Sequence, residues 1–157
     1  AMELPPSLRS RFPNARLEDS FGMAALSIAA ADLLETVRVL QSEFGFDLFS
    51  DVTAIDWLGQ DPRFELVYHL YSTRSFARVR IKCRVDESDP VVESLTPLYG
   101  SAAFMERECH DMYGIRFRGN EDLRPILLYE GFVGHPLRKD YAKDHEQPLV
   151  PYRSEGA

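Results

Sequence analysis

Cysteine is scarce in this chain of 157 residues, which contains only Cys83 and Cys109. Two cysteines so far apart form neither a disulfide framework nor a paired-cysteine zinc motif, so we expect a reducing, cytosol-side compartment. Long apolar runs are also missing. The longest nearly uncharged stretch, Phe21 to Ala31, has 11 residues, whereas a membrane-spanning helix needs about 20. The sequence therefore predicts no membrane span.

Positive charge is in the minority, with 18 Lys and Arg residues against 25 Asp and Glu residues and a net charge of −7. A net-acidic chain is a poor candidate for non-specific nucleic-acid binding, which depends on phosphate neutralisation. Hydrophobic residues make up 45% and charged residues 27% of the chain. That balance is typical of a globular protein, and the length fits one domain.

Motifs for autonomous chemistry are absent as well. The sequence has no glycine-rich dinucleotide fingerprint, no phosphate-binding loop and no serine in a glycine elbow. An iron–sulfur cluster usually needs four thiolates, and two cysteines cannot supply them. A mononuclear metal site is conceivable only from Cys109, His110, His135 and His145. Cys109 and His110 are adjacent on an expected helix and point about 100° apart, so we expect no metal site.

The patterns of apolar residues predict alternating helices and strands. The apolar stripe of Leu33, Leu34, Val37 and Leu40 predicts a helix over residues 32–44, and a short helix is expected over 4–12. Strands are expected at 15–19, 23–28, 48–57, 64–71 and 76–85, the last with alternating apolar and basic residues. Residues 91–95 suggest a helical turn, 101–113 a second helix that ends at Gly114, and 115–117 and 126–129 short strands.

These elements predict an α+β fold with two layers, in which helices pack on one face of a mixed, mostly antiparallel sheet. Residues 1–130 would form a single domain. From residue 131 to 157 the chain is rich in Gly, Pro, His and charge, which predicts an extended C-terminal tail that binds a partner.

The expected helix over 101–113 carries an unusual density of charge. Phe104, Arg107, Glu108 and Asp111 share one face, beside an apolar stripe of Met105, Cys109 and Met112. A helix of this kind contacts its own core and something polar. Spacing alone favours a solvated face with weak ion pairs between successive turns.

The motifs of this region resemble one family. They are Glu106-Arg107-Glu108, Asp111, Tyr113-Gly114, Asp122-Leu123-Arg124, and the run Gly134-His135-Pro136-Leu137-Arg138-Lys139-Asp140-Tyr141. Upstream, the strand that ends in Ala54-Ile55-Asp56-Trp57 fits the same pattern. Together they resemble the C subunit of the proton-pumping NADH:quinone oxidoreductase, respiratory complex I.

The resemblance implies a structural subunit without a redox centre. In that family, the C subunit belongs to the hydrophilic arm on the cytoplasmic face of the membrane, as a peripheral subunit. It contacts the quinone-site D subunit and the cluster-bearing B and I subunits, and FMN and iron–sulfur clusters lie in partner subunits. Electrons pass from NADH to quinone in coupling to proton translocation. The candidate interface residues are Glu106, Arg107, Glu108, Asp111, Tyr113, His135, Pro136, Leu137, Arg138, Lys139, Asp140 and Tyr141.

Two alternatives remain open. Membrane-bound hydrogenases, formate hydrogenlyase and F420H2- or ferredoxin-dependent complexes contain a similar subunit. The second alternative is a stand-alone hydrolase or binding module, and no constellation of residues supports it. We further expect Arg138, Lys139 and Asp140 to find charge partners on a neighbouring subunit or on Glu106, Glu108 and Asp111.

Overall fold

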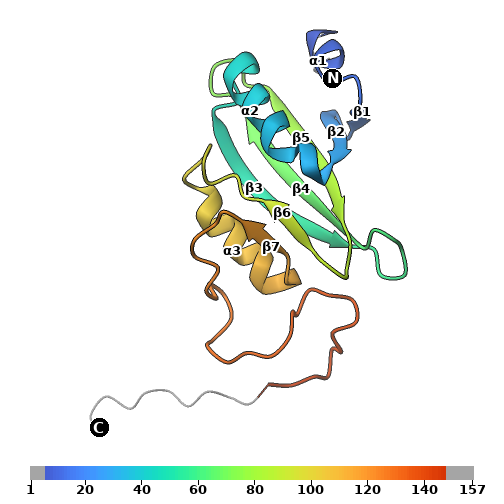
Figure 1. Cartoon of the computed structure of the whole chain (residues 1–157), viewed down its shortest axis with the longest axis vertical. Coiled ribbons are helices and arrows are strands. Elements are labelled where there is room, and N and C mark those ends of the chain that lie inside the picture. Colours follow the sequence, from blue (N-terminus) through green and yellow to red (C-terminus); the bar gives the residue numbers. More distant parts are fainter. Residues whose placement is uncertain (1–5, 148–157) are drawn as a thin grey trace, which may run out of the picture.

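The structure, a computed structural model, describes residues 6–147 (Figure 1). Its main sheet has five strands in the order β1-β2-β5-β4-β3. The strands are β1 Arg16–Ser20, β2 Met23–Ala29, β3 Leu48–Asp56, β4 Phe64–Tyr71 and β5 Arg78–Val85. Only β2 and β5 pair in parallel, and the other neighbours are antiparallel. The prediction of a mixed, mostly antiparallel sheet is confirmed.

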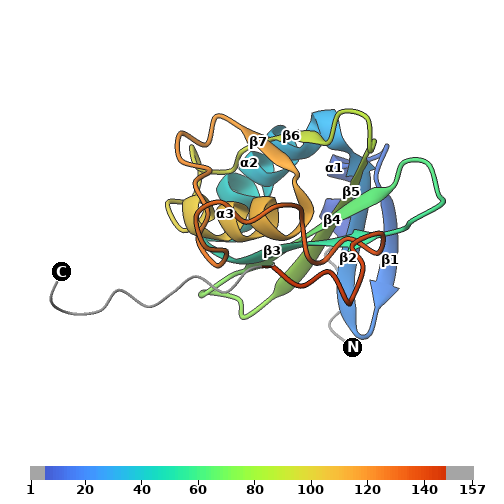
Figure 2. The same cartoon turned by 90° about the horizontal axis from the view of Figure 1, so that it is seen from below.

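The helices are α1 Pro6–Arg11, α2 Leu33–Phe44 and α3 Ala102–Tyr113, with a 3-10 turn, η1, at Ala30–Asp32. Helices α2 and α3 lie on the same side of the sheet (Figure 2). Two short strands, β6 Val91–Glu93 and β7 Arg116–Arg118, form a separate parallel pair on that side. Helix α2 ends at Gly45, which adopts φ 70° in the left-handed region as expected of a C-terminal stop.

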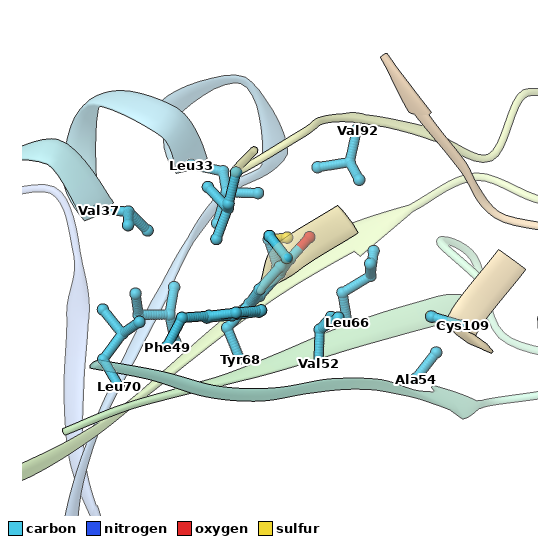
Figure 3. Close-up of a cluster of buried hydrophobic side chains, with 14 of the residues drawn as sticks. Leu33, Val37, Phe49, Val52, Ala54, Leu66, Tyr68, Leu70, Val92 and Cys109 are labelled. Atoms are coloured by element: carbon cyan, nitrogen blue, oxygen red, sulfur yellow. The ribbon is translucent and has the colours of Figure 1, made fainter. Parts of the chain in front are cut away.

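The core lies between the sheet and the helices (Figure 3). Leu33 and Val37 of α2 face Phe49 of β3 and Tyr68 of β4, and all four side chains are buried. Cys109 reaches the same core from α3. Burial disfavours a thiolate, and the pKa of Cys83 is raised to about 12. The two thiols therefore serve as small core residues.

Two local predictions were wrong. Residues 91–95 form no helical turn and begin instead with strand β6. Val91 pairs there with Arg116, which is so distant in sequence that a local pattern does not reveal the pairing. Residues 126–129 form no strand, because the N–H groups of Ile126, Leu127 and Leu128 donate to a side chain of α3. Between residues 119 and 147 the chain forms turns and bends without a helix or a strand. No helix among residues 6–147 is long and apolar enough to cross a bilayer.

The face of the sheet away from the helices carries the basic row of β5. Lys82 lies 3.0 Å from Glu18, and Arg84 lies 3.6 Å from Glu65. Acidic residues of the same chain therefore neutralise this end of the row, so these two cations are not free to recruit a partner.

Candidate partner-binding site

Helix α3 is the scaffold of the site. It ends at Gly114, where φ 75° turns the chain and the Gly114 N–H donates to the His110 carbonyl at 2.7 Å. Ser101 precedes the helix, but its hydroxyl makes no capping bond to the first turn. The start of α3 is instead fixed by packing, since Ala102 is fully buried.

Glu106 faces the interior of the chain and is fully buried. Its carboxylate accepts hydrogen bonds from the Ser94 hydroxyl, the Leu95 N–H and the Asn120 amide, at 2.7, 2.7 and 2.9 Å. Burial raises the pKa of Glu106, and the three donors oppose that shift. Glu106 therefore ties α3 to the segments on either side of it, and it offers no surface to a partner.

Arg107 and Asp111 lie one turn apart on α3 and hold the loop of residues 122–128. The Arg107 guanidinium donates to the carbonyls of Arg124 and Pro125 at 2.9 and 3.0 Å. One oxygen of the Asp111 carboxylate accepts the N–H groups of Ile126, Leu127 and Leu128, at 2.7, 3.0 and 3.4 Å. The helix face that spacing left open as solvated is thus covered by the chain's own loop, and only Glu108 of its charged residues is exposed.

This arrangement leaves apolar side chains in solvent. Phe104 on the first turns of α3 is exposed, as are Ile126 and Leu127 on the loop that Arg107 and Asp111 hold. We call Phe104, Ile126 and Leu127 the apolar rim. Three exposed large apolar side chains on α3 and on the loop bound to it make this face a candidate for docking.

The tail closes the C-terminal end of α3. The last carbonyls of a helix have no partner inside the helix. Here the His135 ring nitrogen Nδ1 donates to the Asp111 carbonyl at 2.9 Å, the Leu137 N–H to Met112 at 3.2 Å and the Arg138 Nε to Tyr113 at 2.6 Å. Burial lowers the pKa of His135. Residues 135–138 therefore cap a helix that ends more than twenty positions earlier.

A buried arginine anchors the tail further along. Arg63 is 2% exposed and binds both oxygens of the buried Asp56, at 2.8 and 2.7 Å. Its guanidinium also lies 2.8 Å from Asp140, and the Lys139 N–H donates to Asp56 at 2.8 Å. The hydrogen bonds from Arg63 hold the pKa of Asp56 and that of Asp140 below their ordinary values. We call Arg63, Asp56 and Asp140 the Arg63 cluster.

Of the two alternatives predicted for the tail charges, pairing with the acids of α3 is wrong, and pairing with a neighbouring subunit stays a prediction. Asp140 does find a charge partner in its own chain, but that partner is Arg63. The Arg138 side chain donates to the Tyr113 carbonyl, and the Lys139 backbone N–H donates to Asp56. None of the three pairs with the side chains of Glu106, Glu108 or Asp111, because two of those are buried in other networks. Asp56 and Arg63 were missed as anchors. The only signal for this pair in the sequence was its position: Asp56 ends one strand, and Arg63 precedes the next.

Of the other predicted residues, some support the surface from inside and some form the surface itself. Tyr113 is buried, Pro136 is half-buried and Leu137 is exposed. Tyr141 stacks on Phe132 at 6.2 Å between ring centroids, which folds the tail back on itself. The candidate set therefore contains side chains that support the surface from inside and side chains that form it.

Nothing in the described part of the chain suggests reaction chemistry. Within residues 6–147, no three His, Cys, Asp or Glu side chains are grouped so that they could hold a metal ion. His110 and His135 approach edge to face at 6.4 Å, and each binds a backbone carbonyl.

Comparison with known proteins gives this surface a context. The family model for the respiratory-chain NADH dehydrogenase 30 kDa subunit matches residues 26–147. The chain belongs to this family.

Members of the 30 kDa subunit family resemble the chain over most of its length. The C subunit of the NADH-quinone oxidoreductase of Citrifermentans bemidjiense is 42% identical over 136 residues, which are 85% of this chain and 84% of that protein. The C subunit from Moorella thermoacetica is 40% identical over 134 residues, 85% of this chain and 90% of that protein.

Two solved structures share the fold. A trypsin-resistant fragment of Nqo5 is 28% identical, with a TM-score of 0.65 over 74% of this chain and 94% of that one. A chain of the membrane-bound sulfane sulfur reductase, an archaeal respiratory membrane complex, is 25% identical, with a TM-score of 0.77 over 87% and 82%. The fold of this chain therefore also occurs in a respiratory membrane complex other than the NADH-quinone oxidoreductase.

Proposed function

We propose that this member of the 30 kDa subunit family is a docking subunit in the hydrophilic arm of an NADH:quinone oxidoreductase and carries no redox group of its own. The observation that carries the proposal is the apolar rim, because Arg107 and Asp111 are engaged in holding a loop that exposes Ile126 and Leu127. A free monomer gains nothing from that arrangement.

The proposed partners are the quinone-site D subunit and the cluster-bearing B and I subunits. FMN and iron–sulfur clusters would be held in partner subunits. Glu108 and Lys139 are exposed charges of the candidate set, and they would set the orientation of docking. The protein would lie on the cytoplasmic side, attached to the membrane only through the complex.

Assembly of the complex tests the proposal. Leu127→Ser and Phe104→Ser remove two side chains of the apolar rim without touching the hydrogen bonds of Arg107 and Asp111. We expect the folded variant to be lost from the purified complex, together with the NADH:quinone activity of the membranes. Leu58→Ser is the matched control, because Leu58 is also an exposed apolar side chain but lies in a distant turn. Normal assembly of both rim variants would contradict the proposal.

A related respiratory complex is the second candidate, favoured by the higher TM-score of the sulfane sulfur reductase chain. The relatives from Citrifermentans bemidjiense, Rhizobium meliloti and Moorella thermoacetica, at 40–43% identity, are named for the NADH-quinone enzyme, and they favour the first candidate. Co-purification decides between the two, because only the NADH enzyme brings a flavin-containing NADH-oxidising module with the tagged chain.

A further inference from the structure

The His135 ring uses only one of its two nitrogens for a hydrogen bond. Nδ1 donates to the Asp111 carbonyl at 2.9 Å, and because a carbonyl can only accept, the neutral ring carries its proton on Nδ1. Nε2 has no hydrogen-bond partner within residues 6–147. The edge of the ring formed by Nε2 and Cδ2 lies against Gly114, with Cδ2 2.6 Å from the position of a β-carbon there. Nε2 is therefore the nitrogen that acid would protonate.

A proton on Nε2 would be poorly accommodated at this position. Gly114 presents a C–H group where other residues have a side chain, and a C–H group can donate a weak hydrogen bond but cannot accept one. The N–H group of the half-buried imidazolium would lie against Gly114 without an acceptor, which is unfavourable. The neutral ring fits this site, and the charged ring does not.

The charges around His135 also disfavour a second cation. The charged and titratable groups that act on the ring are His110 and Asp111 of α3 and Arg138 of the tail. The C-terminal end of a helix ordinarily favours a cation, but the Arg138 guanidinium already fills that role by donating to the last carbonyl of α3. The Asp111 carboxylate is engaged by the N–H groups of residues 126–128. Burial, with smaller contributions from Arg138 and His110, lowers the pKa of His135.

The ring is coupled to the rest of the tail cap. Leu137 and Arg138 follow it closely and donate to the last two carbonyls of α3. The Arg138 N–H also donates to the His135 carbonyl at 3.1 Å, so these residues form one turn. A ring that leaves Gly114 would therefore displace the whole turn.

We propose that His135 is a pH-dependent switch: its neutral ring holds residues 134–138 on the end of α3, and uptake of one proton from solvent at Nε2 in mild acid releases this segment. No other covalent bond forms or breaks. The switch is a property of the chain by itself, so it holds or fails independently of the proposed docking. It is also distinct from the Arg63 cluster, because Asp56 and Asp140 titrate at a lower pH than histidine.

NMR of the full chain tests the switch directly. Because the pKa of His135 is lowered on the folded chain, the ring stabilises the tail fully above the ordinary histidine pKa of about 6.5, and less as the pH falls through the lowered value. We expect the His135 ring to titrate below that ordinary value. The protection of residues 137–141 against hydrogen exchange, relative to the intrinsic rate at each pH, should fall at least about threefold between pH 7 and pH 5. Titration at or above the ordinary value, or unchanged protection, would overturn the proposal.

His135→Asn separates the charge of the ring from its hydrogen bond. The asparagine amide can still donate to the Asp111 carbonyl but takes up no proton, so tail protection in this variant should be the same at pH 7 and pH 5. A fall that persists in this variant would overturn the proposal. If the variant holds the tail at neither pH, the titration of the wild type decides.

Two matched controls identify the titrating group. His145→Asn removes an exposed histidine of the same tail, and His110→Asn removes the imidazole beside His135. Both variants keep His135, so both should keep the fall in protection between pH 7 and pH 5. Loss of the fall in either control would assign the switch to that histidine and overturn the proposal.

Discussion

The imidazole of His135 lies in the space that a β-carbon on Gly114 would occupy. The same β-carbon would lie 2.6 Å from the Arg138 guanidinium. The helix terminus and the tail therefore approach each other as closely as a bare glycine allows. This contact relates the Tyr-Gly end of α3 to the Gly-His-Pro-Leu-Arg run of the tail. The glycine leaves room for the tail, and the tail caps the last carbonyls of the helix.

Gly114→Ala should separate the tail from α3. The substitution places a side chain at φ 75° and displaces His135 and Arg138. Gly59→Ala is the matched control, since Gly59 has φ 86° and open space around it. The control should lose only backbone strain of about 1–2 kcal/mol, and Gly114→Ala should lose more. Urea unfolding gives the free energies, and trypsin should cleave residues 131–147 faster only in Gly114→Ala. Equal effects would show that the tail is not held there.

Arg63→Met should be among the most damaging single changes in the chain. It leaves Asp56 buried without its counter-charge, and removal of one partner of a buried pair costs about 3–5 kcal/mol. Arg124→Met, whose pair with Asp122 is exposed, should have little or no effect. Denaturant unfolding compares the two variants. A small effect at Arg63 would mean that the Arg63 cluster does not anchor the tail.

Acid should release the same anchor. The pKa values of Asp56 and Asp140 are lowered in the folded chain by the hydrogen bonds from Arg63. Both groups therefore stabilise the fold fully above the ordinary aspartate pKa of about 3.9, and this stabilisation is lost as the pH falls through their folded pKa values. The protection of residues 138–141 against hydrogen exchange, taken relative to the intrinsic rate at each pH, should fall as the pH is lowered from 5 through this range. In Asp56→Asn, exchange should already be fast at pH 7.

Tyr68→Phe should be neutral or stabilising. The Tyr68 hydroxyl is fully buried, and no group within residues 6–147 hydrogen-bonds to it. A buried hydroxyl without a partner costs about 1–3 kcal/mol of desolvation. Tyr99→Phe removes a hydroxyl that donates to the Phe46 carbonyl at 2.6 Å and should lose about 1 kcal/mol. Thermal melting of the two variants distinguishes these outcomes. A lower melting temperature of Tyr68→Phe would show that its hydroxyl has a hydrogen-bond partner.

Local patterns predicted the main sheet and helices because each signal lies within one segment. The alternation of Val79 and Ile81 with basic residues placed β5, and Gly45 and Gly114 marked the helix ends. The contacts that build the site escaped prediction because they join distant segments. Nothing in the order of residues indicates that Arg63 binds Asp140. The charge density of α3 drew attention to Glu106 and Asp111 as interface candidates, but both side chains are buried, and which way they face depends on the segments packed against the helix.

Glu106→Gln tests that distinction through the pH dependence of stability. Because burial raises the pKa of Glu106, the folded chain binds this proton more tightly than the unfolded chain. The free energy of unfolding of the wild type should therefore fall as the pH rises from about 4.3, the ordinary value, through the folded pKa. The variant should lack this decline. It should also lose about 1 kcal/mol, because its amide oxygen replaces only one carboxylate oxygen and its NH2 group then faces either the Leu95 N–H or the donors Ser94 and Asn120.

Glu108→Gln is the control on the same helix, since Glu108 is exposed. It removes the same charge without removing a buried carboxylate, so its unfolding curves should follow the wild type at every pH between 4 and 7. If the wild type and Glu106→Gln instead show the same pH dependence, the Glu106 carboxylate is not held in the interior. The residue would then return to the set of groups available to a partner, and α3 would present its whole acidic face to the complex.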